Sequence, residues 1–352
     1  MSQHKRATIR DVARLAGVSA ATISRYLNGH LAIPAATETR INEAVNRLNY
    51  TANHSARTLS LGRTRMLGLV LPDITNAFFA SFASAAEDHA FARGYSLILC
   101  NTRNDPGREE HYLNLLKSRQ LDALILLPTN PQLTYEQVAK LDGLPVIIAD
   151  ENISGLNAPK VFVENVEGGH IATRHLIESG HRRIAHIAGP ASFLSGKERF
   201  EGYRRALDEY GIPFRAEYVI HGPYEAGFGM EAARSLLKLA LPPTAIFAAS
   251  DLTALGVLQV VRELKLGVPQ DISLVGFDDM PYAQLLLPAL TTIRQPVEEM
   301  GRCAVDTVID LLAGTPPATN ETRLPLTLIA RDSVSPPTAR EVKRGIPTKN
   351  AE

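Results

Sequence analysis

The sequence has few cysteines, no long apolar run and no net charge. Its two cysteines, Cys100 and Cys303, lie in apolar surroundings without metal-ligand spacing, so we expect buried free thiols in a reducing compartment. No apolar run reaches membrane-spanning length. Charged Arg10, Asp11 and Arg14 interrupt the N-terminal segment where a signal peptide needs an apolar core. These absences disfavour membrane and secreted proteins, and we expect a cytoplasmic chain.

Motifs for catalysis are also missing. None of the ten histidines pairs at metal-ligand spacing, no serine lies in a G-x-S-x-G setting, and no Cys–His pairing offers a nucleophile. His181 with Arg182 and Arg183 is predicted to form a solvated turn. Residues 227–232 fit the dinucleotide pattern G-x-G-x-x-A, but they do not follow a strand directly, and a loop entering a helix is the better interpretation. We therefore expect no enzyme, no metal and no cofactor.

Charge is distributed unevenly along the chain. Residues 1–65 hold ten Lys/Arg and three Asp/Glu, a net +7, and the rest of the 352 residues carries the balancing −7. The length allows two or three domains with a large core. A basic head on an acidic body is the asymmetry expected of a nucleic-acid-binding head.

The stretch Thr8–Asn28 has the pattern of two short helices joined by a tight turn. Thr8 can cap the first helix, with Asp11 reaching back in a capping box, and Gly17 can end it in the left-handed conformation. Ser19 can cap the second helix. Two helices this short must brace each other, which predicts a helix-turn-helix, a shape that offers its second helix to the DNA major groove. A small helical hairpin used only for packing is the alternative.

Two further segments complete the basic head. A third helix is predicted over residues 36–48, because Ile41, Ala44, Val45 and Leu48 share one face. Residues 53–62 could form one or two helical turns with Ala56 and Leu59 on one side. By composition alone, a plain linker is the favoured interpretation of this second segment.

From Met66 onward, apolar strands alternate with amphipathic helices. Such alternation predicts parallel sheets covered by helices on both faces, and about nine strands favour two α/β lobes with a ligand in the cleft between them. The predicted strands are 66–71, 95–100, 123–127, 146–149, 160–163, 183–187, 217–220, 245–248 and 272–276. The predicted helices are 77–92, 108–118, 168–179, 197–210, 230–238 and 253–264.

A series of ordered motifs resembles the lactose-repressor (LacI) family of bacterial transcription regulators. The match runs from about residue 8 to 335. In the head it includes Asp11-Val-Ala-Arg-Leu-Ala-Gly-Val-Ser19, Glu38-Thr-Arg40, Leu48-Asn-Tyr50 and Ala56-Arg-Thr-Leu59. In the body it includes Arg93-Gly-Tyr95, Gly180-His-Arg-Arg-Ile184, Arg199-Phe-Glu-Gly-Tyr203, Val275-Gly-Phe-Asp-Asp279 and Leu290-Thr-Thr-Ile293.

The resemblance implies that the head binds operator DNA in the major groove as part of a homodimer. Arg25 would make the main base contact, because a guanidinium suits guanine, while Ala20 and Ala21 depart from members with large polar residues there. Residues 53–65 would be a hinge that folds on DNA, with Leu59 wedged into a minor-groove step. The implied DNA-binding residues are Thr8, Ile9, Ser19, Ala20, Ala21, Thr22, Ser24, Arg25, Asn28, Tyr50, Asn53, Ala56 and Leu59.

The body, by the same resemblance, is similar to a periplasmic sugar-binding protein whose lobes enclose a small sugar-like effector. Carboxylates and arginine can hold sugar hydroxyls, and aromatic faces can cover the ring. The alternatives are that Asp278 only caps a helix and that Phe78 and Phe79 are ordinary core. The implied effector-binding residues are Phe78, Phe79, Asp150, Ser195, Arg199, Tyr224, Ser250 and Asp278.

The expected organisation is a helix-turn-helix head at 1–52, a hinge at 53–65 and a ligand-binding and dimerisation body at 66–340. The lobes would be 66–163 with 293–325, and 164–292 with 326–340. Residues 335–352 have no leucine heptad, so we expect a dimer, and we expect the tail at 341–352 to be disordered. The expected function is a regulator, and most simply a repressor, of a carbohydrate operon; a periplasmic-type sugar receptor or a sugar- or nucleotide-dependent enzyme are the alternatives.

Overall fold

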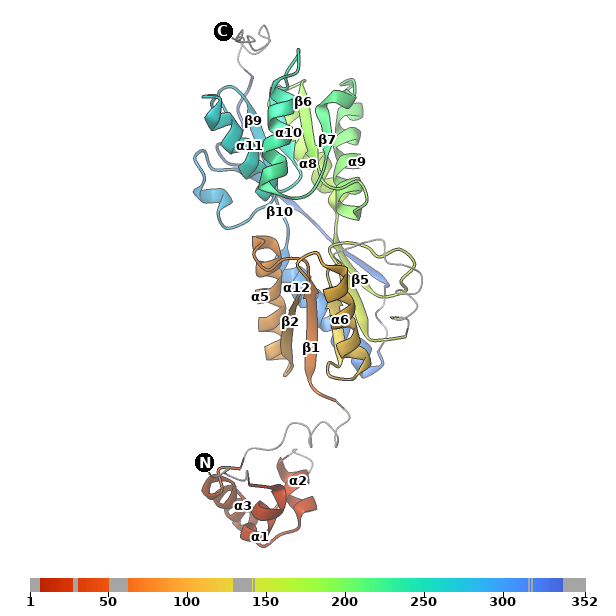
Figure 1. Ribbon diagram of the computed structural model, residues 1–352, viewed down its shortest axis with the longest axis vertical. Coiled ribbons are helices and arrows are strands. Elements are labelled where there is room, and N and C mark those ends of the chain that lie inside the picture. The colour runs from red at the N-terminus through yellow and green to blue at the C-terminus, as the bar shows by residue number, and fades with distance from the viewer. Residues whose placement is uncertain are drawn as a thin grey trace. The chain divides into compact units, whose positions relative to one another are not determined.

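The chain divides into two compact units in a computed structural model, Met1–Thr64 and Arg65–Glu352, called here the head and the body (Figure 1). The structure describes residues 7–27, 31–50, 63–128, 141, 143–315, 317 and 319–337. Among these residues, no helix has the length and apolar character needed to cross a bilayer.

Within its described residues, the head contains three helices, α1 (Ile9–Ala16), α2 (Ala20–Leu27) and α3 (Ala35–Arg47). The Asp11 carboxylate accepts the Thr8 backbone N–H at 3.0 Å, so the predicted capping interaction is present. Gly17 ends α1 with φ +67°. The Ser19 hydroxyl accepts the Thr22 N–H at 3.0 Å and caps α2. Local capping thus fixes the turn between the two helices.

One apolar cluster holds the three helices together. Val12, Ile23 and Ile41, one from each helix, are fully buried, and Ala16 and Ala44 fill the space between them. Tyr26 of α2 also donates its hydroxyl to Glu38 of α3 at 2.9 Å. The predicted third helix is confirmed, with bounds one residue earlier than expected.

The described part of the body contains two six-stranded sheets. The first, in the N-lobe, has the order β11-β5-β4-β3-β1-β2 and is parallel throughout. Its strands are β1 (Met66–Leu71), β2 (Ser96–Asn101), β3 (Ala123–Leu126), β4 (Val146–Ala149), β5 (Lys160–Val163) and β11 (Glu321–Leu324).

The second sheet, in the C-lobe, has the order β12-β10-β9-β8-β6-β7. Only β12 runs antiparallel, against β10. Its strands are β6 (Ile184–Ala188), β7 (Val219–His221), β8 (Ala245–Ala248), β9 (Ser273–Asp278), β10 (Thr291–Arg294) and β12 (Thr327–Ile329).

Helices cover both faces of each sheet, as a parallel sheet requires. In the N-lobe, α5 and α12 pack on one face and α6 on the other; in the C-lobe, α8 and α9 share one face and α10 and α11 the other. The helices are α5 (Ala77–Ala92), α6 (Pro106–Lys117), α8 (Asn165–Glu178), α9 (Leu194–Glu209), α10 (Ala226–Leu237), α11 (Asp251–Glu263) and α12 (Val297–Ala313).

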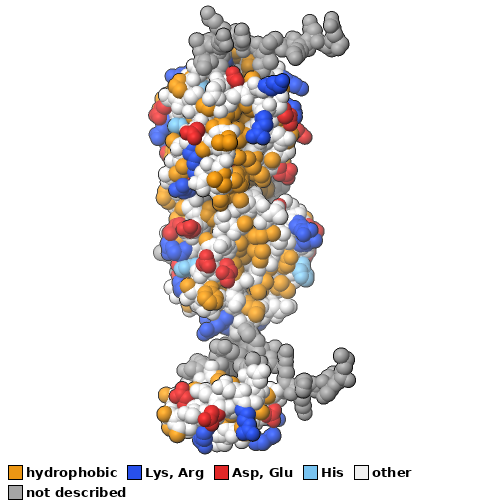
Figure 2. Space-filling model, turned by 90° about the vertical axis from the view of Figure 1, so that its left-hand side faces the viewer, with side chains coloured by type: hydrophobic (Ala, Val, Ile, Leu, Met, Phe, Trp, Pro, Cys, Tyr) orange, Lys and Arg blue, Asp and Glu red, His pale blue; other side chains and the backbone are white. Residues whose placement is uncertain are grey.

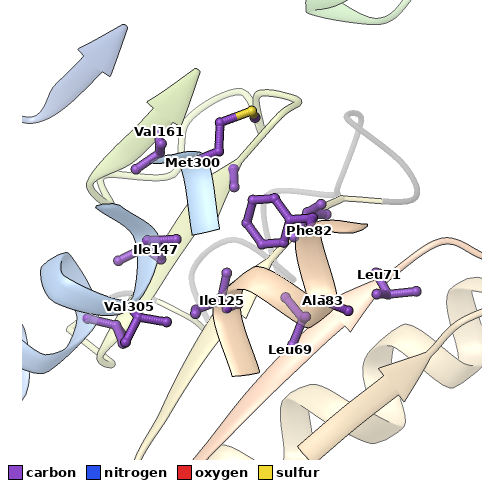
Figure 3. Packing of buried hydrophobic residues seen from close by; sticks show 14 of the residues in the cluster. Leu69, Leu71, Phe82, Ala83, Ile125, Ile147, Val161, Met300 and Val305 are labelled. Carbon is purple, nitrogen blue, oxygen red and sulfur yellow. The ribbon is translucent and has the colours of Figure 1, made fainter. Parts of the chain in front are cut away.

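Close packing of the N-lobe core joins segments far apart in the sequence (Figure 3). Phe82 of α5 and Met300 of α12 are both fully buried among strand residues such as Leu69, Ile125 and Ile147. Helix α12 and strand β11 therefore belong to the N-lobe, although they follow most of the C-lobe in the sequence.

Two details differ from the sequence predictions. His181 lies not in a solvated turn but in the C-lobe interior, 1% exposed, where it contacts Thr244 at 2.9 Å, Ser273 at 3.0 Å and the Ser335 carbonyl at 2.9 Å. The solvated-turn prediction was wrong because the hydroxyls of Thr244 and Ser273, distant in sequence, form hydrogen bonds with the imidazole nitrogens. Strands β10 to β12 and helix α12 were not among the predicted elements.

Candidate DNA-binding surface and interlobe site

Helix α2 presents an exposed polar face opposite its buried Ile23. Ser19, Ala21 and Arg25 are exposed, and Ala21 and Arg25 lie four residues apart on one side of the helix. Ser24 is half-buried, and Ala20 packs partly on the head core. The Thr22 hydroxyl lies 2.8 Å from that of Ser19, so both take part in the cap. This face can approach a DNA groove without unfolding the helix.

The remaining predicted head residues have mixed positions. Thr8 is exposed at the start of α1, whereas Ile9 and Tyr50 are half-buried against the head core. Asn28, Asn53, Ala56 and Leu59 lie outside the described residues.

The body site is built around Arg199 in the second turn of α9. Its side chain is 3% exposed, donates to the Asn165 side chain at 2.8 Å and donates to the Ala249 carbonyl at 2.6 Å. The guanidinium stacks on the Phe277 ring, with 3.6 Å between its central carbon and the ring centroid. These contacts hold a positive charge rigidly at the carboxyl ends of the C-lobe strands.

Carboxyl groups from both lobes face this guanidinium. Asp278, at the end of β9, lies 3.9 Å from Arg199, and Asp150 follows β4 of the N-lobe. Burial raises the pKa of Asp278 to about 7 and that of Asp150 to about 6, and the nearby positive charge of Arg199 opposes both shifts. Both aspartates have positive φ, +113° and +69°. Strained backbone and raised pKa together are typical of a functional site.

A third carboxylate, that of Glu151, connects the lobes directly. It accepts the backbone N–H of Leu194 at 2.7 Å and that of Ser195 at 3.3 Å, and it also accepts the Ser195 hydroxyl. Its residue is 4% exposed, and burial raises its pKa to about 8, with the charge of Asp150 adding to the shift. Glu151 was not among the predicted site residues, although it directly follows Asp150.

Ser195 and Tyr224 extend this contact. Their hydroxyls lie 2.7 Å apart, and burial raises the pKa of Tyr224 above its ordinary value. The ring of Tyr224 passes so close to Gly189 that a Cβ there would lie 2.1 Å from the tyrosine oxygen. Gly189 is therefore needed for Tyr224 to reach the site.

Gln295, a second residue absent from the predicted set, lies beside Asp278. It directly follows β10, is 4% exposed, and donates its amide to Asp278 at 2.7 Å. No described residue donates to its buried side-chain oxygen. A buried oxygen normally accepts a hydrogen bond, and this one can accept a bond from a ligand hydroxyl.

The other predicted effector residues have partners of their own. Phe78 is buried in the N-lobe core, and Phe79 packs on it edge-on with ring centroids 5.3 Å apart. The Ser250 hydroxyl accepts the Thr253 N–H at 3.1 Å and caps α11. Neighbouring Asp251, also not predicted, accepts the Thr292 hydroxyl at 2.6 Å.

The competing nucleotide motif has a structural explanation. Gly227 and Gly229 lie inside α10, not in a loop after a strand. A Cβ on Gly229 would lie 2.2 Å from the Thr253 carbonyl oxygen, so this glycine allows α10 to approach α11. The motif is part of a helix-packing contact. The predicted loop entering a helix was wrong in its loop part, because α10 already begins at Ala226.

Comparison with known proteins gives two domain matches. Residues 8–53 match the model for bacterial regulatory proteins of the lacI family, and residues 173–334 match a periplasmic binding protein-like domain. The chain is 37% identical over 324 residues to the ribose operon repressor of Escherichia coli strain K12, covering 92% of this chain and 98% of the repressor.

Two solved structures extend the likeness to the whole fold. A transcriptional regulator CelR–cellobiose complex has 32% identity and a TM-score of 0.71, covering 93% of this chain and all of that one (100%). The Lac repressor dimer bound to operator and the anti-inducer ONPF has 25% identity and a TM-score of 0.84, with 94% and 100% covered. These relatives are regulators, not enzymes. The chain belongs to the lacI family of bacterial regulatory proteins.

Proposed function

We propose that this chain is a dimeric repressor of a carbohydrate operon, controlled by a hydroxyl-rich effector bound between its two lobes. Its relatives include a ribose operon repressor and a regulator in complex with cellobiose. The observation that carries the effector assignment is the group of buried polar side chains around Arg199. They come from both lobes and leave the Gln295 oxygen without a described donor.

The head reads the operator through α2. Arg25 is the residue best suited to a guanine contact, and exposed Ala21 on the same face leaves room for a thymine methyl group. The residues proposed for backbone contacts are Thr8, Ser19, Thr22, Ser24, Asn28 and Tyr50. In this proposal residues 1–52 are the DNA-binding domain, and residues 53–65 are the hinge whose Leu59 enters a minor-groove step.

An apolar face of the body supports pairing with a second copy. Phe91 of α5 is 76% exposed, and Ile98 and Leu99 on the edge strand β2 are also exposed. In the C-lobe, Leu285 and Leu287 are exposed at 77% and 91%. Hydrophobic side chains gather over both lobes on the side that carries α5 and β2 (Figure 2). Large apolar faces of this kind mark protein interfaces.

Effector control then follows from the interlobe contacts. An effector that binds one arrangement of the lobes better than another shifts the population of the dimer by that difference in affinity. The shift changes the spacing of the two hinges and so their ability to fold on the operator. A repressor of this kind acts where the chromosome is, in the cytoplasm.

The test uses the full chain with DNA selected from a random pool. Selected fragments should contain a two-fold symmetric site, and neutral pentoses or hexoses should change the affinity for it. Arg199→Met should remove the sugar response and keep operator binding, whereas Arg204→Met, on the exposed side of α9, should keep both. Failure to select any sequence, or loss of operator binding with Arg199→Met, would contradict the proposal.

A further inference from the structure

The start of α9 is capped by a carboxylate from the other lobe. The residue before the helix, Phe193, has no side chain that can accept a hydrogen bond from the first turn. Glu151 supplies the acceptor instead, at 2.7 Å from the Leu194 nitrogen. The N-terminus of a long helix is a favourable position for an anion, and here the protein's own side chain occupies it.

The groups around Glu151 are predominantly acidic and accept hydrogen bonds. Asp150 and Asp278 interact electrostatically with each other and with Arg199, and Asp150 also interacts with Glu151. Asp251, which interacts electrostatically with Asp278, adds a fourth carboxyl group. Tyr224, three residues after β7, interacts with Glu151 and Asp150. The Arg199 guanidinium is thus the one positive charge named among several carboxyl groups. Two of its nitrogens already donate to Asn165 and to the Ala249 carbonyl.

From this arrangement we infer that Glu151 sets the charge selectivity of the interlobe site, so that it accepts uncharged polyhydroxyl ligands and rejects those bearing a carboxylate or phosphate. The inference rests on the proposed function, because it concerns the effector of that site. A sugar hydroxyl can donate to the unpartnered Gln295 oxygen or to a carboxylate, which an anionic group cannot do. An anionic group would also find the α9 amides already occupied.

The raised pKa values of the carboxyl groups agree with this interpretation. Burial and neighbouring negative charge already raise the pKa of Asp150, Glu151 and Asp278. A ligand anion would raise them further and would have to bind with a proton taken up by the site. Binding of an anion should therefore strengthen as pH falls, because the carboxyl groups then lose their charge.

The experiment measures binding of matched ligands to the full chain by calorimetry at pH 9, where Glu151, with its pKa raised to about 8, is ionised. The probes are D-ribose, D-glucose and cellobiose, each beside its aldonate, together with D-ribose 5-phosphate. For the sugar that binds, we expect the neutral form to bind roughly tenfold to a hundredfold more tightly than its anionic forms, as for one like charge about 6 Å away. Glu151→Gln, which keeps the shape and removes the charge, should reduce this ratio at least tenfold.

Glu198→Gln is the matched control, because the carboxylate of Glu198, on α9, likewise bridges the lobes, through Arg323 at 2.8 and 3.0 Å. It should leave the ratio unchanged. If Glu151→Gln does not fold, wild-type protein gives a separate test: aldonate affinity should rise between pH 8 and pH 6 more than sugar affinity. Phosphate esters are excluded from this arm because their own second pKa is about 6.

Three results would overturn the inference. These are an anionic form that binds more tightly than its neutral sugar, a Glu151→Gln ratio equal to that of wild type, and parallel pH profiles for sugar and aldonate. If no neutral or anionic probe binds while operator binding persists, the proposed sugar effector itself is wrong. The two failures are thus distinguishable.

Discussion

Asp278→Asn is expected to stabilise the body while removing its response to the effector. Burial raises the pKa of Asp278 from 3.8 to about 7. Once the pH exceeds the pKa of this group in the unfolded chain, ionisation of Asp278 favours the unfolded state. The sign follows from proton binding. The folded state binds more protons than the unfolded state, and stability falls as pH rises toward 7. Asparagine keeps an oxygen for the Gln295 amide and removes the titration.

The size of the effect comes from the pH interval. Each pKa unit corresponds to 1.36 kcal/mol. Titration of Asp278 should therefore lower the free energy of unfolding of wild type by about 2–3 kcal/mol between pH 5 and pH 8, and the variant should not show this decrease. The charge of Asp278 also helps to raise the pKa of Asp251, so its removal should lower the pKa of Asp251. The advantage of the variant should therefore be small at pH 5 and largest at pH 8.

Calorimetric unfolding of the ligand-free full chain at pH 5, 6, 7 and 8 measures this difference. The body transition is followed, and the head transition serves as an internal reference. Asp332→Asn, at an exposed position near the C-terminal end of the described residues, is the control and should follow wild type at every pH. Parallel profiles for wild type and Asp278→Asn would refute the buried-charge argument, and a variant that is less stable at pH 8 would reverse it.

Four other substitutions test three separate parts of the molecule. Arg25→Ala should weaken operator binding by about 1–3 kcal/mol and relax base preference at one position, as measured by competition with substituted operators; a uniform loss on all DNA would assign Arg25 to phosphate. Leu59→Ala should weaken operator binding more than non-specific binding, and equal losses would contradict the proposed wedge. In α10, Gly229→Ala should destabilise the body because its Cβ meets the Thr253 carbonyl at 2.2 Å, whereas Gly227→Ala, which has open space, should stabilise it by about 0.5–1 kcal/mol in thermal unfolding.

Local signals in the sequence predicted the head well. The capping pair of Thr8 and Asp11, the turn glycine Gly17 and the cap Ser19 each act within a few residues, and each has the predicted role in the structure. The long apolar strands were equally clear, because buried parallel strands are apolar at nearly every position. Strands β11 and β12 are short and partly exposed, so their sequences lack this pattern.

Contacts between distant segments could not be predicted in the same way. The Glu151 carboxylate accepts from Leu194 and Ser195, which lie 43 and 44 residues away on α9 of the other lobe. His181 is similar, since its hydroxyl partners lie 63 and 92 residues away. Both lie in polar stretches of sequence that resemble surface turns. Tertiary structure, rather than composition, decides whether such a side chain is solvated or buried.

In the proposed mechanism, the first two turns of α9 hold the contacts that an effector would change. Ser195, Glu198 and Arg199 are adjacent on the helix surface, and they contact respectively Glu151 of the N-lobe, Arg323 of β11 in the N-lobe, and Asn165 and Ala249 of the C-lobe. Arg199 therefore remains fixed to its own lobe while its two neighbours bind the other. A ligand that replaces the Glu151 contact acts on the same helix turns as the Glu198–Arg323 ion pair. Movement of the lobes must break or re-form both contacts together, because one rigid helix carries them.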